Sequence, residues 1–85
     1  MRLTAVESTV LATVGYNEAR ELLQLEFCGG AIYHYFGVPT TVQQALLAAP
    51  SKGSYFNQAI RGRFPFCRVS ELHADAPDAA MWVGR

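Results

Sequence analysis

Two tyrosines separated by a single residue, Tyr33 and Tyr35, are the first residues whose spacing suggests chemistry. On an extended strand they would point to the same side and lie about 7 Å apart. Aromatic rings at that spacing can stack on successive bases of a single nucleic-acid strand. Alternatively, both rings belong to the hydrophobic core and only their hydroxyls reach the surface. Both interpretations stay open, because Ile32, His34 and Phe36 on the other side of the strand are together as apolar.

A candidate anion site lies in the segment from Ser51 to Ser54, which contains Lys52 and two hydroxyl groups. The first turn of a helix has N–H groups without intrahelical partners, and its dipole favours an anion. If a helix begins here, Lys52 and Ser54 would complete a phosphate site. The spacing of a P-loop is absent, so the segment does not indicate nucleotide hydrolysis. The alternative is an ordinary capped helix start with a lysine in solvent.

Three arginines follow at Arg61, Arg63 and Arg68, within a segment of unusual charge balance. The net charge of the whole chain is zero, which by itself argues against a dedicated binder of polyanions. Positions 27–70, however, contain no Asp or Glu, while they hold eight of the aromatic residues and four of the basic ones. Such a composition is typical of proteins that contact phosphates and bases together. Alternatively, the arginines are separate solvated charges.

Patterns for catalysis or metal binding are weak. No nucleophile elbow and no paired-carboxylate site is present. Cys28 and Cys67 are far apart, and neither has ligand spacing to His34 or His73. We interpret both cysteines as free thiols in apolar surroundings. The sequence therefore predicts no enzymatic activity, no metal site and no cofactor.

Length and composition predict one globular domain. The chain has 85 residues, of which 51% are hydrophobic and 16% charged, which is too apolar for a disordered chain. No apolar run is long enough to span a bilayer, and the N-terminal residues lack a secretory stretch. We expect a single soluble, cytoplasmic domain.

Periodicity predicts the elements that would position these side chains. Alternation over residues 9–16, 21–28 and 31–36 indicates three strands, with Val10, Ala12, Val14 and Tyr16 on one side of the first. Gly29 and Gly30 supply a hairpin turn. The fold class predicted is α+β: an antiparallel meander of three to four strands, residues 67–69 adding the fourth, with two helices packed on one face.

The two helices are predicted from apolar spacing and end signals. The first begins at Thr40 or Thr41, one of which would cap it, and ends at Pro50. The second begins at Ser51 or Ser54 and ends near Arg61. Gly62 follows as its C-terminal cap.

Several short sequence motifs occur along the chain in an order that resembles a known family. In sequence they are Ser8, Gly15-Tyr16-Asn17, the apolar Leu23, Leu25 and Phe27, Tyr33-His34-Tyr35, Gly37-Val38-Pro39, the run from Ser51 to Asn57, and Ile60-Arg61. Over residues 5–68 they are similar to the KTSC domain. That domain is named for its occurrence at the C-terminus of some lysyl-tRNA synthetases and is also a small stand-alone bacterial or phage protein. The resemblance implies a role in RNA binding.

We predict a KTSC-like domain over residues 5–70 and a C-terminal tail over 71–85. The predicted function is a non-catalytic module that binds RNA or DNA with low sequence specificity. Its predicted nucleic-acid contacts are Tyr33, Tyr35, Lys52, Ser54, Arg61, Arg63 and Arg68.

The alternative function is a protein–protein interaction module, in which the aromatic surface meets another protein and nucleic acid has no part. Unpaired sheet edges recruit partners unless they are blocked, and the three candidate strands carry only Glu21 and Glu26 as charges. The apolar segment 81–83 could fold back or cross to a neighbour. For both functions, nucleic-acid binding and protein interaction, we predict a homodimer.

Overall fold

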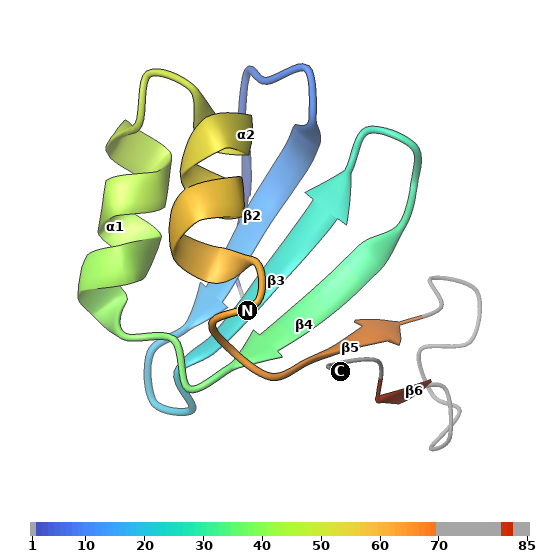
Figure 1. Ribbon diagram of the computed structural model, residues 1–85, viewed down its shortest axis with the longest axis vertical. Helices are drawn as coiled ribbons and strands as arrows, with labels where there is room; N and C mark the ends of the chain where they lie inside the picture. Colours follow the sequence, from blue (N-terminus) through green and yellow to red (C-terminus); the bar gives the residue numbers. More distant parts are fainter. Residues whose placement is uncertain (1, 70–80, 83–85) are drawn as a thin grey trace.

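The chain folds into one antiparallel sheet with its helices on one face, as seen in a computed structural model that describes residues 2–69 and 81–82 (Figure 1). The sheet order is β1-β2-β3-β4-β5-β6. The strands are β1 (Arg2–Ala5), β2 (Leu11–Asn17), β3 (Leu22–Phe27), β4 (Ile32–Phe36), β5 (Phe66–Val69) and β6 (Met81–Trp82). The helical elements are α1 (Thr40–Ala48), α2 (Lys52–Tyr55) and η1 (Phe56–Ile60), a π-helical turn that continues α2.

The predicted α+β meander with two helices on one face is confirmed, but the sheet is larger than three or four strands. β1 pairs with β2, and β6 pairs with β5, so six strands form the sheet. Sequence periodicity missed both because they are only four and two residues long, too short to show alternation. The boundary predicted at residue 70 and most of the predicted tail lie outside the described residues.

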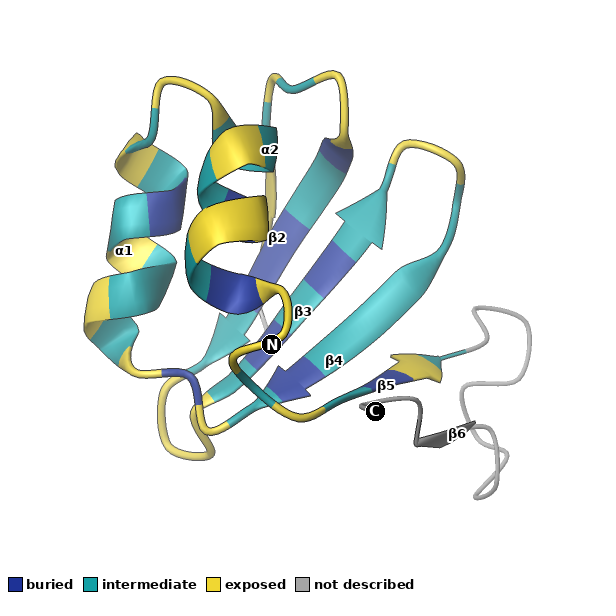
Figure 2. Cartoon of the chain, in the orientation of Figure 1, coloured by how far each residue is buried: buried dark blue, intermediate teal, exposed yellow. Residues whose placement is uncertain are grey.

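The core lies between the sheet and the helices (Figure 2). From the sheet it takes Leu11, Val14, Leu23, Leu25 and Tyr35, and from the other elements and connections Val38, Leu46, Phe56 and Ile60. Within the described part of the chain, no helix has the length and apolarity needed to cross a membrane.

The predicted side-chain alternation in the first strand is wrong at its start. A β-bulge shifts the β2–β3 register between Leu11 and Thr13, so the side chains beyond it change sides. Leu11 is fully buried beside Val14, whereas Val10 precedes the strand and is 39% exposed. The bulge therefore brings Val10 to the surface next to the helices.

The helix ends agree only partly with the predicted caps. Neither Thr40 nor Thr41 caps α1, whose N-cap is Pro39 and makes no side-chain cap bond. The Tyr16 hydroxyl instead donates to the Val38 carbonyl at 2.6 Å, which ties β2 to the start of α1. Ser51 does cap α2, because its Oγ accepts from the Ser54 N–H at 3.3 Å.

Candidate functional site

Both candidate tyrosines project from β4 toward the helices, but their exposure differs. Tyr35 is buried at 3% exposure, with its ring stacked on Phe66 at 5.3 Å between centroids. Tyr33 is half-buried at the margin of the core. The two rings stack with centroids 6.4 Å apart. Tyr35 therefore belongs to the hydrophobic core, which was one of the two interpretations of the sequence, while Tyr33 retains access to the surface.

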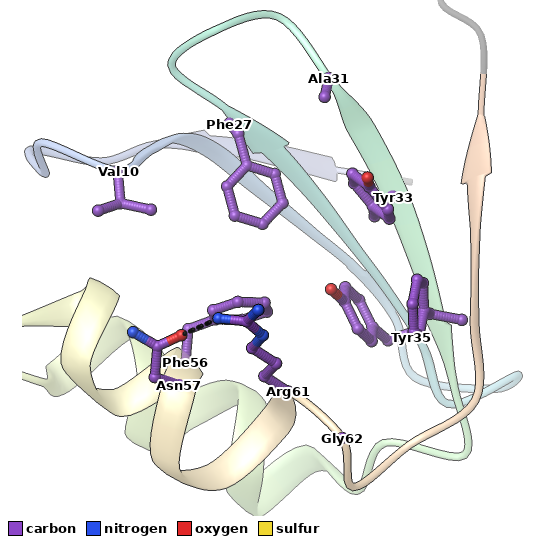
Figure 3. Close-up of a pocket in the computed structure, with 10 residues that line it drawn as sticks. Val10, Phe27, Ala31, Tyr33, Tyr35, Phe56, Asn57, Arg61 and Gly62 are labelled. Carbon is purple, nitrogen blue, oxygen red and sulfur yellow. Dashed lines mark hydrogen bonds between the residues drawn. The ribbon is translucent and has the colours of Figure 1, made fainter. Parts of the chain in front are cut away.

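The tyrosines line an open pocket of about 500 Å³ between η1 and the strands (Figure 3). Its lining is mostly aromatic and aliphatic: Val10, Phe27, Ala31, Tyr33, Tyr35, Phe56, Asn57, Arg61, Gly62 and Phe66. We call it the aromatic pocket. Among the described residues of the lining, Asn57 and Arg61 supply the polar side chains besides the two tyrosine hydroxyls.

Edge-to-face contacts hold the rings of the aromatic pocket. The Phe27 ring meets Tyr33 at 5.6 Å and 84°, and it meets Phe56 at 5.4 Å and 75°. Such geometry is favoured by the ring quadrupoles and fixes each ring through its neighbours. Phe27, Phe56 and Phe66 are among the aromatic residues of positions 27–70. The sequence alone could not assign them to one site, because they come from three separate elements.

The wide turn of η1 brings Asn57 and Arg61 to the mouth of the pocket. Its last hydrogen bond runs from the Arg61 N–H to the Phe56 carbonyl at 2.8 Å, five residues back. π-Helical turns of this kind often occur at functional sites. The Arg61 Nη1 group donates to Asn57 Oδ1 at 3.5 Å, and both side chains are exposed (Figure 3).

The electrostatics of the pocket keep Tyr35 protonated. The pKa of Tyr35 is raised to about 12, chiefly by burial and also by Tyr33, while Arg61 acts in the opposite direction. At neutral pH the hydroxyl is therefore neutral, and the guanidinium of Arg61 supplies positive charge at the pocket.

The other two predicted arginines differ in position. Arg68 is exposed on β5 and is the register partner of Tyr33, so both side chains lie on the helix-facing side of the sheet. Arg63 follows η1, where its Nε donates to the Gln58 carbonyl at 3.0 Å. Arg63 does not line the aromatic pocket.

Lys52 and Ser54 line a second, adjoining pocket of about 470 Å³. The ammonium of Lys52 donates to the Ala49 carbonyl at 3.1 Å. The Ser51 hydroxyl donates to the Ser54 hydroxyl at 3.0 Å. These groups are thus engaged within the turn, as in the capped-helix alternative, and α2 itself is only four residues long.

The described part of the chain offers little support for a metal site or for thiol chemistry. No group of three or more His, Cys, Asp or Glu residues gathers among residues 2–69 and 81–82. Cys28 is exposed and Cys67 is buried, and both are free thiols. Burial raises the pKa of the Cys67 thiol.

Relatives of known sequence fall into two groups. Over 64 residues the chain is 41% identical to a lysine–tRNA ligase of Nostoc punctiforme, a match that covers 75% of this chain but 11% of the ligase. It is 43% identical over 61 residues to an uncharacterized protein of Stutzerimonas stutzeri, covering 72% of this chain and 86% of that protein. The chain therefore corresponds to a small part of the ligase and to most of the small protein.

A solved structure and a family model also match this chain. The fold is similar to the crystal structure of a KTSC domain protein from Yersinia pestis, with a TM-score of 0.77 and 30% identity. That match covers 81% of this chain and 97% of the other. The KTSC domain model matches residues 7–64, which include β2, β3, β4 and η1 but neither β1 nor β5. The chain belongs to the KTSC domain family.

Proposed function

We propose that the chain is a non-catalytic module that binds single-stranded nucleic acid, with one base held in the aromatic pocket. Arg61 and Arg68 then contact the phosphates on either side of that base. The observation that carries the proposal is an open pocket whose described lining contains five aromatic rings together with Arg61. Arg68 lies opposite one of those rings, that of Tyr33, in the strand register.

The chemistry of the lining favours a base over other apolar groups. Stacking of a base on aromatic side chains contributes about 1–3 kcal/mol per base and tolerates any sequence, since every base has a π-face. None of the described residues that line the aromatic pocket is acidic, so a phosphate beside it meets no repelling carboxylate from them. With only Asn57, Arg61 and the tyrosine hydroxyls to form hydrogen bonds, we expect low sequence specificity.

The relatives are compatible with a nucleic-acid partner. One group carries the name lysine–tRNA ligase, which denotes an enzyme that acts on tRNA. Because the chain corresponds to only 11% of those ligases, we propose that it shares with them the binding of RNA or DNA and not the ligase reaction. We accordingly expect it in the cytoplasm.

The remaining predicted contacts are proposed as outer contacts. Lys52 and Ser54 line the adjoining pocket, and Arg63 lies on the turn that follows η1. Each would meet the strand as it leaves the aromatic pocket, after exchanging its present hydrogen bond for one to the ligand.

Fluorescence anisotropy with short RNA and DNA oligonucleotides tests the proposal. We expect measurable binding at low salt and a loss of about tenfold in affinity for Tyr33→Ala, equivalent to one lost stack. Tyr55→Ala is the matched control, because Tyr55 is a half-buried tyrosine that does not line the aromatic pocket. Circular dichroism checks the fold of both variants. Undetectable binding at low salt, or binding that does not depend on salt, would contradict the proposal.

The free edge of β1 supports a homodimer as a second proposal. β1 is the first strand of the sheet order, so one of its sides has no partner strand among the described residues. Leu3 is 53% exposed on it, and no proline or lysine blocks the edge. Such edges pair readily with a further strand, and a second copy of the chain offers an identical one.

Light scattering at micromolar concentration tests this second proposal. We expect a mass of twice 9.3 kDa for the native chain and a monomer for Leu3→Lys, because an edge lysine opposes pairing. Thr41→Lys, at an exposed site on α1, should leave the dimer unchanged. A native mass near 9.3 kDa would rule the dimer out.

A further inference from the structure

A second pocket adjoins the aromatic pocket across a shared wall. Val10 and Asn57 line both, Val10 from the segment before β2 and Asn57 from η1. In Figure 3 these two side chains lie across from each other at the end of the aromatic pocket away from Tyr35. The second pocket is formed by residues 7–10 and the start of α2. We call it the polar pocket.

The shared wall is held in place by local contacts. The Ser8 hydroxyl accepts from the Val10 N–H at 3.0 Å and from the Leu11 N–H at 3.2 Å. Gly53 of α2 lies so close that a Cβ there would be 2.9 Å from Val10 Cγ2. The segment is therefore seated directly on the helix, and the two pockets keep a fixed relation to each other.

The polar pocket differs from the aromatic pocket in its chemistry. Its lining includes one acidic residue, Glu7, and the hydroxyl-bearing residues Ser8, Thr9, Ser51 and Ser54. Its cation, Lys52, is turned toward the Ala49 carbonyl. A carboxylate repels phosphate but accepts hydrogen bonds from hydroxyl groups, so this lining favours a polyol.

The polar pocket thus offers the group that a ribose requires, next to a pocket that suits its base. Acidic side chains are the partners that proteins commonly use for the 2′-hydroxyl of a ribose. That hydroxyl is also what distinguishes RNA from DNA at a given site. A nucleotide of RNA could place its base in the aromatic pocket and its sugar across the wall formed by Val10 and Asn57.

We propose that the polar pocket binds this ribose, with Glu7 accepting a hydrogen bond from its 2′-hydroxyl, so that the module selects RNA over DNA. The inference rests on the proposed function, because it assumes that a base occupies the aromatic pocket. It adds the identity of the polymer, which the aromatic pocket alone does not discriminate.

The test compares two polymers that differ only in the 2′-hydroxyl. Labelled oligouridine RNA and oligodeoxyuridine, each of about ten nucleotides, are titrated with the native chain and with Glu7→Gln. We expect the native chain to bind the RNA about tenfold more tightly, as for one hydrogen bond to a charged group. Glu7→Gln should weaken RNA binding by part of this factor and leave DNA binding unchanged, because an amide oxygen accepts the hydrogen bond more weakly than a carboxylate does.

A charge-matched control and a third polymer sharpen the interpretation. Glu18→Gln removes the same charge from the exposed turn after β2, and it should preserve the RNA preference. 2′-O-methyl oligouridine, which lacks the hydroxyl donor, should bind the native chain no better than the DNA does. Equal affinity of the native chain for RNA and DNA overturns the ribose assignment alone.

Two further outcomes separate the rival explanations. If Glu7→Gln strengthens binding of both polymers, a phosphate occupies the polar pocket, and the ribose assignment is wrong. If the native chain binds neither polymer at low salt, the proposed function itself fails, and the ribose assignment fails with it.

Discussion

Arg68 lies directly opposite Tyr33 in the antiparallel pairing of β4 with β5. Opposed residues of an antiparallel pair share one side of the sheet with their Cβ atoms about 5 Å apart. An exposed arginine is therefore the strand neighbour of a ring that lines the aromatic pocket. Arg61 on η1 lines the pocket itself.

The salt dependence of binding should report these two arginines. Each phosphate contact to a single strand contributes about −0.7 to the slope of log affinity against log salt. If Lys52, Arg61, Arg63 and Arg68 all contact phosphates, the slope is about −3. Arg61→Gln combined with Arg68→Gln should make it less steep by about 1.4.

Arg20→Gln serves as the control for this measurement. Arg20 is exposed in the turn between β2 and β3 and lines neither pocket. Its removal should lower nonspecific attraction slightly without changing the slope by a full contact. An identical slope for the native chain and the double variant would show that phosphates are contacted elsewhere.

Alanine at the two tyrosines should separate stability from binding. Tyr35→Ala removes a ring that is 3% exposed, and large-to-small changes of this kind lower the free energy of unfolding by about 3 kcal/mol. Tyr33→Ala should cost less stability and more affinity, since Tyr33 is half-buried in the pocket. Urea denaturation and anisotropy measure the two effects. Equal losses of stability would mean that both rings serve the core.

The contact between Gly53 and Val10 predicts non-additive effects on stability in a double-mutant cycle. In the native chain, Gly53→Ala places a Cβ 2.9 Å from Val10 Cγ2, so the strain should offset any gain in helix propensity. In a Val10→Ala background the same change should stabilise the protein by about 0.5–1 kcal/mol, the usual advantage of Ala over Gly in a helix. Thermal denaturation of the four proteins gives the coupling. Additive effects would mean that the segment and α2 are not in firm contact.

His34 should make the protein less stable in mild acid. Burial lowers the pKa of His34 below its ordinary 6.5, and its Nε2 lies 2.7 Å from Gln24 Oε1. The folded state therefore binds a proton less readily than the unfolded state does. Stability from this group is full above pH 6.5 and declines as the pH falls through 6.5 toward the folded-state pKa.

His34→Gln is the variant that isolates this effect, because an amide can keep the hydrogen bond to Gln24 without titrating. The free energy of unfolding is compared at about pH 7.5 and about pH 5.5, on either side of the ordinary histidine pKa. We expect the native chain to lose more stability than the variant over this interval. The same loss in both proteins would assign the pH dependence to carboxylates.

Side-chain alternation predicted the central part of the fold well. Leu23, Leu25 and Phe27 lie on one side of β3, and Tyr33 and Tyr35 on one side of β4, as their period of two indicates. These strands are long enough for a local pattern to define two faces. Local signals also placed the start of the second helix at Ser51 or Ser54, and Ser51 is its N-cap, with residues only three apart involved.

The local sequence did not determine which face of β4 the helices would cover. The two faces of β4 are equally apolar, with Tyr33 and Tyr35 on one face and their neighbours on the other. Only the docking of Leu46, Phe56 and Ile60 from the helices buried Tyr35 and left Tyr33 at the margin of the core. The bulge at Leu11 and the short strand β1 likewise depend on pairing with β3 and β2. Strand pairing and burial are contacts between residues far apart in the chain, and a local period carries no information about them.

The candidate site shows the same division. Residue types and the acid-free, aromatic composition of positions 27–70 led to aromatic and basic contacts for a nucleic acid, which stay a prediction. Only the tertiary structure gathered Phe27, Phe56 and Phe66 from three elements around Tyr33 and brought Arg61 into the same lining. It paired Arg68 with Tyr33 across two strands and left Arg63 outside the lining. Glu7, which no pattern had singled out, came to line the polar pocket because the segment before β2 packs on Gly53. Composition is a property of the chain, whereas a pocket exists only where the folded chain brings separate surfaces together.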